Sequence, residues 1–441
     1  MKKEISSIVL FLLGVVFNAP AQEVMNLPKA ISIGLENNYD IKVADRFILI
    51  AENNDSWARA GRGPIIDLNG SFTNNLVNDN NPASFLQGTY YGGSLGTSLN
   101  VQWVLFSGGR IKIAKDRLGS LVEQEALFKN NAIHDLLFNI YQQYYAVIFQ
   151  QERKEVLQSS LNLSKSRLAY EQERRNFGAT NSYNLIQFEN AVITDSINLV
   201  NQIQSIDVAK RQLYNILDLE GQADFRFEDR LSIMPEEIEV DRLRRVLSEE
   251  NYTLKTLEMT AALNQINTKL EEANDRLSVS LSTSVGYNRN GFKFFAVNEN
   301  TGEDFPFIQS NRFNGNVAVN LTYNLYDGGV QQTNIQNARI QEDIDQINIL
   351  EAKTELNNQL DILIANYDLQ RSQVFLADEQ IQIASRNLDM TGERFKAGQV
   401  TSIDFRNVQV QFLNAAFNKV NTMYNLILAK SEIDYLVGRF N

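Results

Sequence analysis

Cysteine is absent from the chain of 441 residues, and histidine occurs only once, at His134. Without cysteine the chain has no disulfide framework, no thiol nucleophile and no N-terminal lipid on a Cys. A lone histidine without cysteines or a carboxylate cluster is usually structural, so we expect no catalytic or metal-binding role for His134. These absences make an enzyme the weakest hypothesis, and they predict no cofactor and no metal.

Positive charge is in deficit, because 41 Lys and Arg residues oppose 53 Asp and Glu residues and leave a net charge of −12. This balance repels phosphate and argues against nucleic acid as a partner. Long apolar runs are also missing after the N-terminus. No later stretch is therefore predicted to cross a membrane as a helix.

The N-terminus carries the pattern of a secretory signal. Lys2 and Lys3 form a short basic region, the residues from Ile5 to Phe17 are mostly apolar, and Ala19-Pro20-Ala21 supplies a small-x-small cleavage site. The apolar run is shorter than the about 20 residues that a spanning helix needs. Residues 1–21 are therefore predicted to be a signal peptide.

What the sequence does contain is an internal duplication. A shift of 220 residues places Gly108-Gly109 on Gly328-Gly329 and continues without a gap to the end of each half, whereas upstream of the strands the shift is 213. The pattern predicts two copies of one structural unit, residues 22–217 and 242–441. The acidic stretch between them, residues 218–241, lacks periodicity and is predicted to be a solvated linker.

Each half contains a period-two pattern that is typical of β-strands. The odd positions from 277 to 287 are mostly apolar, whereas the even positions from Ser278 to Ser284 are all serine. Two hairpins are predicted, over 65–106 and 277–326, with strands of about 10–13 residues. One apolar face and one small polar face fit a transmembrane strand, although a soluble β-sandwich also alternates. The signal and aromatics near the strand ends favour the membrane: Trp103, Phe106, Tyr323 and Tyr326.

After each Gly-Gly pair the apolar residues recur three and four apart, without proline and almost without glycine. The pattern predicts two long helices, over 110–176 and 330–396, each near 100 Å at about 1.5 Å per residue. Glycines at the next turns are expected to end these helices, and returning helices of about half their length follow. Two further single helices, predicted over 27–61 and 243–275, would supply the missing half of each returning arm.

Four membrane strands cannot close by themselves, and an open sheet edge in lipid leaves backbone groups unpaired. The chain is therefore expected to associate with cyclic symmetry, as a dimer with eight strands or a trimer with twelve. The polar faces would line a water-filled lumen that the long helices continue as a tube. The predicted object is a conduit.

The chain resembles the TolC-like outer-membrane efflux proteins. The resemblance rests on the duplication and on these segments: Phe106-Ser107-Gly108-Gly109, Tyr326-Asp327-Gly328-Gly329, the tip turns Glu173–Gly178 and Glu393–Gly398, and the helix turns Asn37–Asp40 and Glu250–Thr253. It implies a mixed membrane α/β fold, in which a trimeric twelve-stranded barrel with four strands per chain continues into a long α-helical periplasmic barrel of coiled-coil hairpins. It also implies an outer-membrane location extending into the periplasm, with lipid, a periplasmic adaptor and an inner-membrane pump, proton-driven or of the ABC type, as partners.

The resemblance also implies roles for particular residues. The adaptor-contacting tips map to Gly178, Ala179, Thr180, Gly398, Gln399 and Val400, and the strand-to-helix junctions to Gly108, Gly109, Gly328 and Gly329. The family's acidic rings at the periplasmic constriction map to Asp404 and Asn407, and only Asp404 keeps the carboxylate. Asn184 is the counterpart of Asp404 in the first half. Asp404 is also explained as an acid in the first turn of a helix, where the helix dipole favours it.

Three functions fit these observations. The first is the outer-membrane duct of a tripartite efflux system, and the second is the outlet of a type I protein-secretion system, which differs only in its partner pump. The third is a secreted coiled-coil structural or adhesion protein whose strands form a soluble head. The Gly-Gly pairs are not phosphate-binding loops, because no Gly-Lys-Ser/Thr ending follows them.

Overall fold

The computed structural model describes residues 23–83, 88–219, 225–232, 234–295, 297 and 302–440. The predicted signal peptide, residues 1–21, lies outside these ranges. The chain forms two compact units, each built from both sequence repeats. Unit 1 comprises Met1–Lys42, Asn131–Asn251 and Leu356–Asn441, and unit 2 comprises Val43–Asn130 and Tyr252–Glu355.

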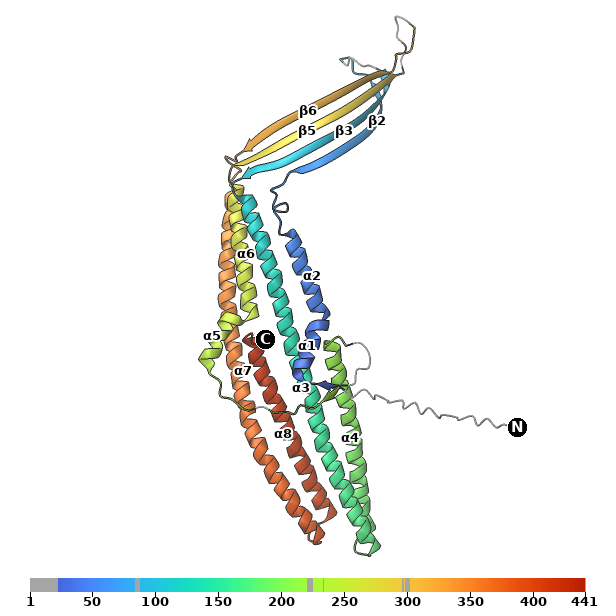
Figure 1. Cartoon of the computed structure of the whole chain (residues 1–441), viewed down its shortest axis with the longest axis vertical. Coiled ribbons are helices and arrows are strands. Elements are labelled where there is room, and N and C mark those ends of the chain that lie inside the picture. Colours follow the sequence, from blue (N-terminus) through green and yellow to red (C-terminus); the bar gives the residue numbers. More distant parts are fainter. Residues whose placement is uncertain are drawn as a thin grey trace, which may run out of the picture. The chain divides into compact units, whose positions relative to one another are not determined.

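Unit 2 contains one antiparallel sheet with the strand order β2-β3-β5-β6 (Figure 1). Its strands are β2 (Ile65–Asp79), β3 (Gly88–Ser107), β5 (Ser278–Phe294) and β6 (Ile308–Thr322), of 15, 20, 17 and 15 residues. The predicted length of 10–13 residues was therefore too short. Backbone pairing continues beyond the alternating region into glycine-, asparagine- and aromatic-rich segments, where the hydrophobic pattern gives no signal.

Left-handed glycines join strands to helices. Gly108 and Gly109 have φ of +61° and +92° before helix α3 (Arg110–Asn176), and Gly328 and Gly329 have φ of +79° and +88° before helix α7 (Val330–Lys396). Side chains rarely adopt these values, and a Cβ on Gly108 would also lie 2.3 Å from Cβ of Arg276. Asp327 then caps α7, because its carboxylate accepts hydrogen bonds from the amides of Gly329 and Gln331.

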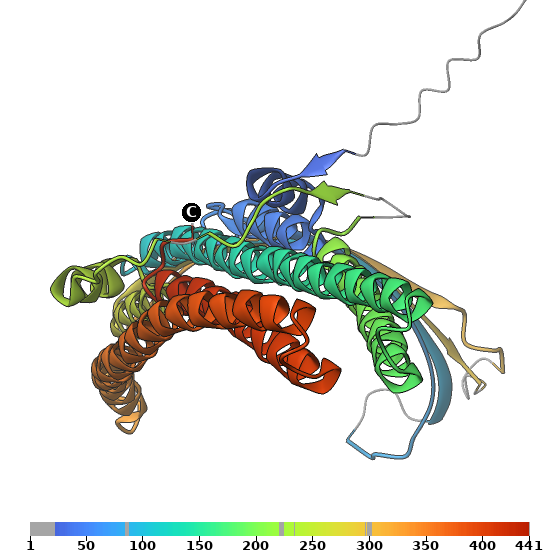
Figure 2. The same cartoon turned by 90° about the horizontal axis from the view of Figure 1, so that it is seen from below.

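Unit 1 contains two helical hairpins, which lie side by side (Figures 1 and 2). Each pairs a 35-residue helix with part of a 67-residue helix: α3 (Arg110–Asn176) with α4 (Ser182–Ile216), and α7 (Val330–Lys396) with α8 (Ser402–Leu436). Gly178 and Gly398, both with φ of +70°, end the long helices. In the second turn the amide of Gly398 donates to Phe395 O and that of Gln399 to Arg394 O, the paired bonds of a Schellman cap.

The two helices predicted over 27–61 and 243–275 are each broken, which corrects the expectation of single helices. The segments are α1 (Leu27–Asn37) with α2 (Tyr39–Asn54), and α5 (Val240–Glu250) with α6 (Tyr252–Asn274). The break falls at Asn38 and at Asn251, whose ψ of 126° is extended. Asparagine side chains stabilise these breaks, because Asn38 Oδ1 accepts from the Ile41 amide and Asn251 Nδ2 donates to Leu436 O.

Residues 218–241 are not merely the solvated linker that the sequence predicts. Strand β4 (Arg226–Phe227) pairs in parallel with β1 (Val24–Met25). Phe227 and Leu231 enter the core of unit 1, and the Tyr144 hydroxyl donates to Asp229. The prediction failed because only a few apolar residues in this acidic stretch carry the packing.

His134 is a buried residue of unit 1. Its ring stacks on Tyr435 with centroids 4.8 Å apart, and its nitrogens face the carbonyl oxygens of Tyr435 and Phe440 at 2.9 and 3.4 Å. These contacts hold the C-terminal segment against α3. They are structural contacts of the kind that the sequence predicts for a lone histidine.

Candidate functional site

The sheet of unit 2 has two chemically different faces. Strand pairing places Leu68 opposite Leu99 and Leu99 opposite Val285, and it places Ile66, Val101, Thr283 and Val317 in one row. The residues between them form the other face: Asp67, Asn69, Ser71, Ser98, Asn100, Ser282, Ser284, Asn288, Asn314 and Asn316. Successive side chains of a strand point to opposite faces, so the apolar and polar faces are each continuous across all four strands.

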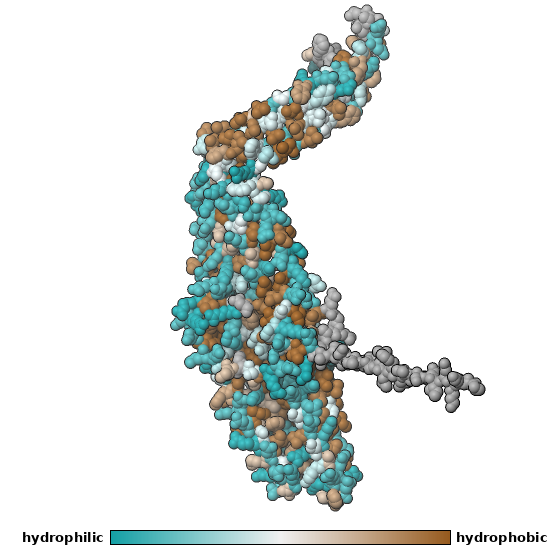
Figure 3. All heavy atoms as spheres, in the orientation of Figure 1, coloured by the Kyte–Doolittle hydropathy of each residue, from teal (hydrophilic) through white to brown (hydrophobic). Residues whose placement is uncertain are grey.

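The apolar face is strongly exposed. Leu68, Phe72, Leu76, Phe313 and Val317 are between 71 and 75% exposed, and apolar residues gather over the sheet in Figure 3. A contiguous apolar surface of this size marks contact with a membrane or with another protein. Ile66 and Leu76 are ten residues apart on β2, which spans about 25 Å of height for a strand tilted as in outer-membrane barrels.

The sheet is also open, because β2 and β6 lie at its edges and pair on one side only. Unpaired edges of long, flat strands are avoided in soluble proteins and are not tolerated in lipid. Among the described residues, no helix is both long and apolar enough to cross a membrane. The sheet thus presents an exposed apolar face and two edges that pair on one side only.

In unit 1, α8 contacts each of the other three long helices, whereas α4 and α7 lie at the two sides of the hairpin pair (Figure 1). Three side chains of α8 make these contacts: Arg406 pairs with Asp195 of α4, Gln409 donates a hydrogen bond to Ser160 of α3, and Lys419 pairs with Asp378 of α7. Among the described residues, no helix packs against the outer faces of α4 and α7 in the way that α8 packs against its neighbours.

Helix α7 carries apolar residues on two opposite faces. The face against the core repeats every seven residues, as Leu360, Tyr367, Val374, Ile381, Leu388 and Phe395. A second stripe lies two positions later, about 200° around the helix at 3.6 residues per turn. Its side chains are between 53 and 68% exposed: Ile362, Leu369, Leu376, Ile383 and Met390. A seven-residue repeat is the signature of a helix that packs lengthwise on another helix.

Helix α4 has the same construction. Phe188, Asp195, Gln202 and Ala209 are buried at seven-residue spacing. The opposite face carries an exposed stripe with the same spacing, Ile186, Ile193 and Val200, at 58, 59 and 64% exposure. The two outer helices of unit 1 thus each display an apolar seam that a partner helix could cover. We call these seams the α4 stripe and the α7 stripe.

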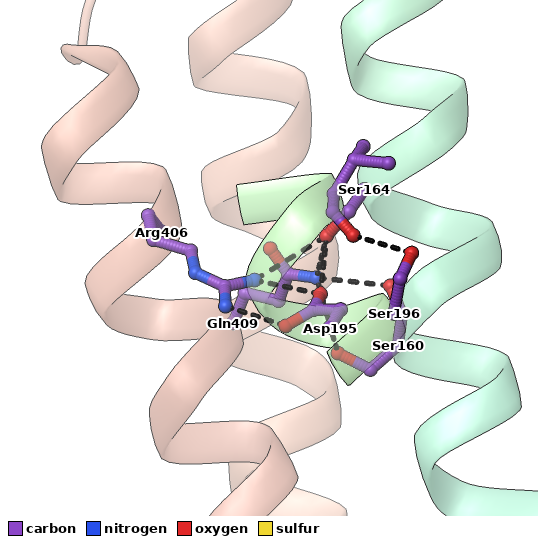
Figure 4. Close-up of polar contacts among 7 residues, drawn as sticks. Ser160, Ser164, Asp195, Ser196, Arg406 and Gln409 are labelled. Carbon is purple, nitrogen blue, oxygen red and sulfur yellow. Dashed lines mark hydrogen bonds and ion pairs between the residues drawn. The ribbon is translucent and has the colours of Figure 1, made fainter. Parts of the chain in front are cut away.

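The buried seam between α3, α4 and α8 contains a polar network (Figure 4). Arg406 Nη2 lies 2.6 Å from Asp195 Oδ1, and Arg406 Nη1 lies 3.0 Å from Asp195 Oδ2. Ser164 donates to the same carboxylate at 2.7 Å, and Gln409 Nε2 donates to Ser164 Oγ at 2.8 Å. The Asp195 side chain is only 1% exposed, so the network ties the first-repeat hairpin to the second-repeat helix α8 inside the core.

The network keeps Asp195 ionised. Burial by itself would raise the pKa of Asp195, but the hydrogen bonds from Arg406 and Ser164, with the charge of Arg406, outweigh it and hold the pKa below its usual value. The sequence pattern did not predict this network, although a signal was present. On the buried face of α4, Asp195 occupies a position where the seven-residue pattern otherwise predicts an apolar core residue.

The predicted tip residues lie in the two turns. Gly178, Ala179, Gly398 and Gln399 are exposed, whereas Thr180 and Val400 are half-buried. Val400 packs against the cluster of Phe188, Phe395 and Phe405. The first tip also presents Phe177, whose side chain is 88% exposed and which was not among the predicted tip residues.

The predicted constriction residues occupy the starts of α4 and α8. Asp404 forms a capping box, in which its carboxylate accepts from the amide and hydroxyl of Thr401 and its own amide donates to Thr401 Oγ1. These hydrogen bonds from Thr401, the side-chain bond above all, lower the pKa of Asp404. Asn184 Oδ1 accepts from Ser402 Oγ at 2.9 Å, so the two helix starts are joined, and Asn407 is exposed one turn after Asp404.

Residues 244–439 match the family model described as outer membrane efflux protein. The resemblance to these efflux proteins is confirmed. The match covers the second sequence repeat and includes the second tip and the capping box of Asp404. It also supports the predicted outer-membrane location, and efflux is transport rather than catalysis. No curated protein matches the chain.

Solved structures of outer-membrane proteins share the fold of this chain. The CmeC channel of Campylobacter jejuni is 16% identical, with a TM-score of 0.72 over 94% of this chain and 85% of CmeC. VceC of Vibrio cholerae is 16% identical, with a TM-score of 0.71 over 93% and 96%. The open state of MtrE of Neisseria gonorrhoeae is 14% identical, with a TM-score of 0.70 over 93% and 88%.

Proposed function

We propose that this chain is the outer-membrane exit duct of a tripartite efflux system. The observation that carries the proposal is the sheet of unit 2, with its exposed apolar face, its continuous polar face of small residues and its two open edges. Such a sheet suits a barrel wall between lipid and water. The helical hairpins of unit 1 supply the periplasmic extension of the duct.

Three copies close the barrel in this proposal. Four strands per chain then give twelve, and β6 of one copy pairs with β2 of the next, so that no edge remains in lipid. The resemblance to the efflux family supports three copies over two. The polar faces of the three sheets line the lumen with serine, asparagine and glycine, and the apolar faces contact the outer-membrane lipid.

The helical part closes in the same way. In a ring of helices every member needs a neighbour on both sides, and the α4 and α7 stripes provide the two surfaces that are left over in one copy. Both stripes repeat every seven residues, so the α7 stripe of one copy can pack lengthwise on the α4 stripe of the next. Closure in the helices and closure in the sheet therefore call for the same cyclic arrangement.

The hairpin tips are the proposed contact for a periplasmic adaptor, which links the duct to an inner-membrane pump, proton-driven or of the ABC type. The tip residues named above are small and exposed, and Phe177 adds a large apolar side chain beside Gly178. A shallow turn with one exposed aromatic suits docking into a partner groove.

Reconstitution of the mature chain in planar bilayers tests the proposed function. We expect discrete conductance steps from a trimer. Its purification should require detergent, because the apolar sheet faces need lipid-like surroundings. A chain that stays monomeric and soluble without detergent, and that forms no channels, would contradict the duct and favour the secreted coiled-coil alternative.

Asp404 is the proposed constriction residue. The three Asp404 side chains of a trimer would form a ring of carboxylates, which their capping hydrogen bonds keep charged. We expect Asp404→Asn to weaken block by a trivalent cation added on the periplasmic side by about tenfold. Single-channel recordings measure the block.

Two controls separate a gate from a helix cap. Asp404→Glu keeps the charge and should keep the block, and Glu393→Gln removes an exposed acid on the other side of the same turn, where it pairs with Lys396. If Asp404→Asn leaves the block unchanged, the carboxylate serves only to begin α8.

A further inference from the structure

The polar face of the sheet changes character at one end. Its rows from Ile65 to Thr73 on β2 consist largely of serine, asparagine and glycine across the four strands. The next two rows are different. One holds Asn75, Gly92, Phe292 and Ile308, and the other holds Val77, Tyr90 and Phe294.

These aromatic residues form one cluster. The rings of Tyr90 and Phe292 have centroids 6.2 Å apart in an edge-to-face arrangement, and those of Tyr90 and Phe294 are 5.4 Å apart. Phe305, which follows β5 in the chain, returns to lie 5.8 Å from Phe294. Phe294 is 8% exposed, so its side chain is covered rather than free. We call Tyr90, Phe292, Phe294 and Phe305 the aromatic collar.

Backbone and side-chain contacts hold the collar in place. Gly92 lies opposite Phe292, and a Cβ on Gly92 would be in ordinary van der Waals contact with the Phe292 ring, at 3.5 Å. The Phe295 amide donates to Thr89 O at 3.0 Å, which extends the pairing of β3 and β5 past the end of the sheet. Lys293 Nζ also donates to Phe305 O at 3.1 Å and holds the returning segment. The cluster is therefore a packed element of the sheet end.

Strand parity decides which way the collar faces. Tyr90, Phe292 and Phe294 share the face of Ser98, Ser284 and Asn288, whereas Tyr91 shares the face of Leu95 and Leu99. The strand end that carries the collar lies opposite the Gly-Gly junctions to α3 and α7, so in the duct it is the outer mouth. The collar rings consequently point to the water-filled side at that mouth.

We propose that the aromatic collar is an apolar constriction at the outer mouth of the duct, which hinders hydrated ions and admits solutes with an aromatic or apolar surface. The inference rests on the proposed duct. Aromatic rings fill more space than the serines and asparagines below them, and each chain contributes a collar, so the lumen is narrower and less polar in these rows than in the rows of the sheet below them. Water and ions leave narrow apolar constrictions readily, which lowers conductance without any moving part.

Single-channel conductance in planar bilayers tests the collar on the full mature chain. The double variant Tyr90→Ser/Phe292→Ser should raise conductance in potassium chloride by about twofold, because it replaces two rings per chain with small polar groups. Tyr90→Phe retains the ring and should keep the wild-type conductance. Tyr91→Ser is the matched control, since it removes the adjacent aromatic from the lipid-facing side and should leave conductance unchanged.

The outcomes separate the collar from the duct. If the wild type forms channels and the double variant has an unchanged conductance, the collar alone is overturned. An equal rise in conductance in Tyr91→Ser also overturns the collar alone. A wild type that forms no channels overturns the duct and the collar together. If the double variant does not assemble, the single Phe292→Ser variant takes its place, with a smaller rise expected and no rise overturning the collar.

Discussion

Replacing both Leu376 and Ile383 with aspartate is expected to leave the chain monomeric. Both residues lie on the α7 stripe, with exposures of 60 and 61%, and neither contributes to the core of its own chain. Two charges per copy at the centre of a helix-to-helix seam would have to be buried without partners, which costs several kcal/mol per site. Light scattering or native mass spectrometry of the protein in detergent measures the loss of the proposed trimer.

The control for this prediction lies on the same helix. Gln382→Asp adds a charge to an exposed position about 100° away from the stripe at 3.6 residues per turn, and it should leave assembly intact. Helical content by circular dichroism should be unchanged in both variants. A trimer that survives the double substitution would mean that the α7 stripe is not an interface between copies.

Removing the Asp195 carboxylate should produce the largest loss of stability among single substitutions. In Asp195→Ala the Arg406 guanidinium loses its bidentate partner, and Ser164 and Gln409 lose the group on which their hydrogen bonds converge. Breaking a buried ion pair from one side costs about 3–5 kcal/mol. The midpoint of denaturant unfolding, followed by circular dichroism, measures the effect. Asp207→Ala, on the exposed side of the same helix, should change the midpoint little.

The same network makes stability depend on acid. The pKa of Asp195 is lowered in the folded chain, so its contribution is fully present above the unfolded value of about 3.9 and is lost as the pH falls through the lower folded value. Asp195→Asn should remove this part of the acid dependence. A wild type and an Asp195→Asn variant that lose stability in parallel below pH 4 would contradict the role of the ion pair.

The sequence indicated the strands and long helices because their signals are local. Alternation from Ser278 to Val285 and the three-and-four spacing after Gly109 and Gly329 each report a periodic backbone with one apolar side. Strand ends were harder to predict, because pairing continues through Gly92 and Gly291, which have no side chain to show a face. The breaks at Asn38 and Asn251 were missed for a similar reason: one residue changes conformation while the apolar pattern continues.

Site residues were predictable where backbone conformation limits the choice of amino acid. Gly178 and Gly398 adopt φ of +70°, which favours glycine, and their place after a long helix made the turns visible. The partners of Asp195 could not be predicted, because Arg406 and Ser164 are far from it in the chain and meet it only through packing. The collar was missed as well, since its aromatics share a face only once the register of β3 with β5 is known.

The sequence by itself determined the duplication, the alternating strands, the long helices and their turns, and through its motifs the resemblance to the efflux family. These follow from repeats and periods that neighbouring residues carry. The tertiary structure alone decided that the polar and apolar faces run unbroken across four strands, that α4 and α7 retain uncovered stripes, and that Asp195 meets Arg406. Those features depend on register and on contacts between distant segments, and a linear pattern does not specify either of them.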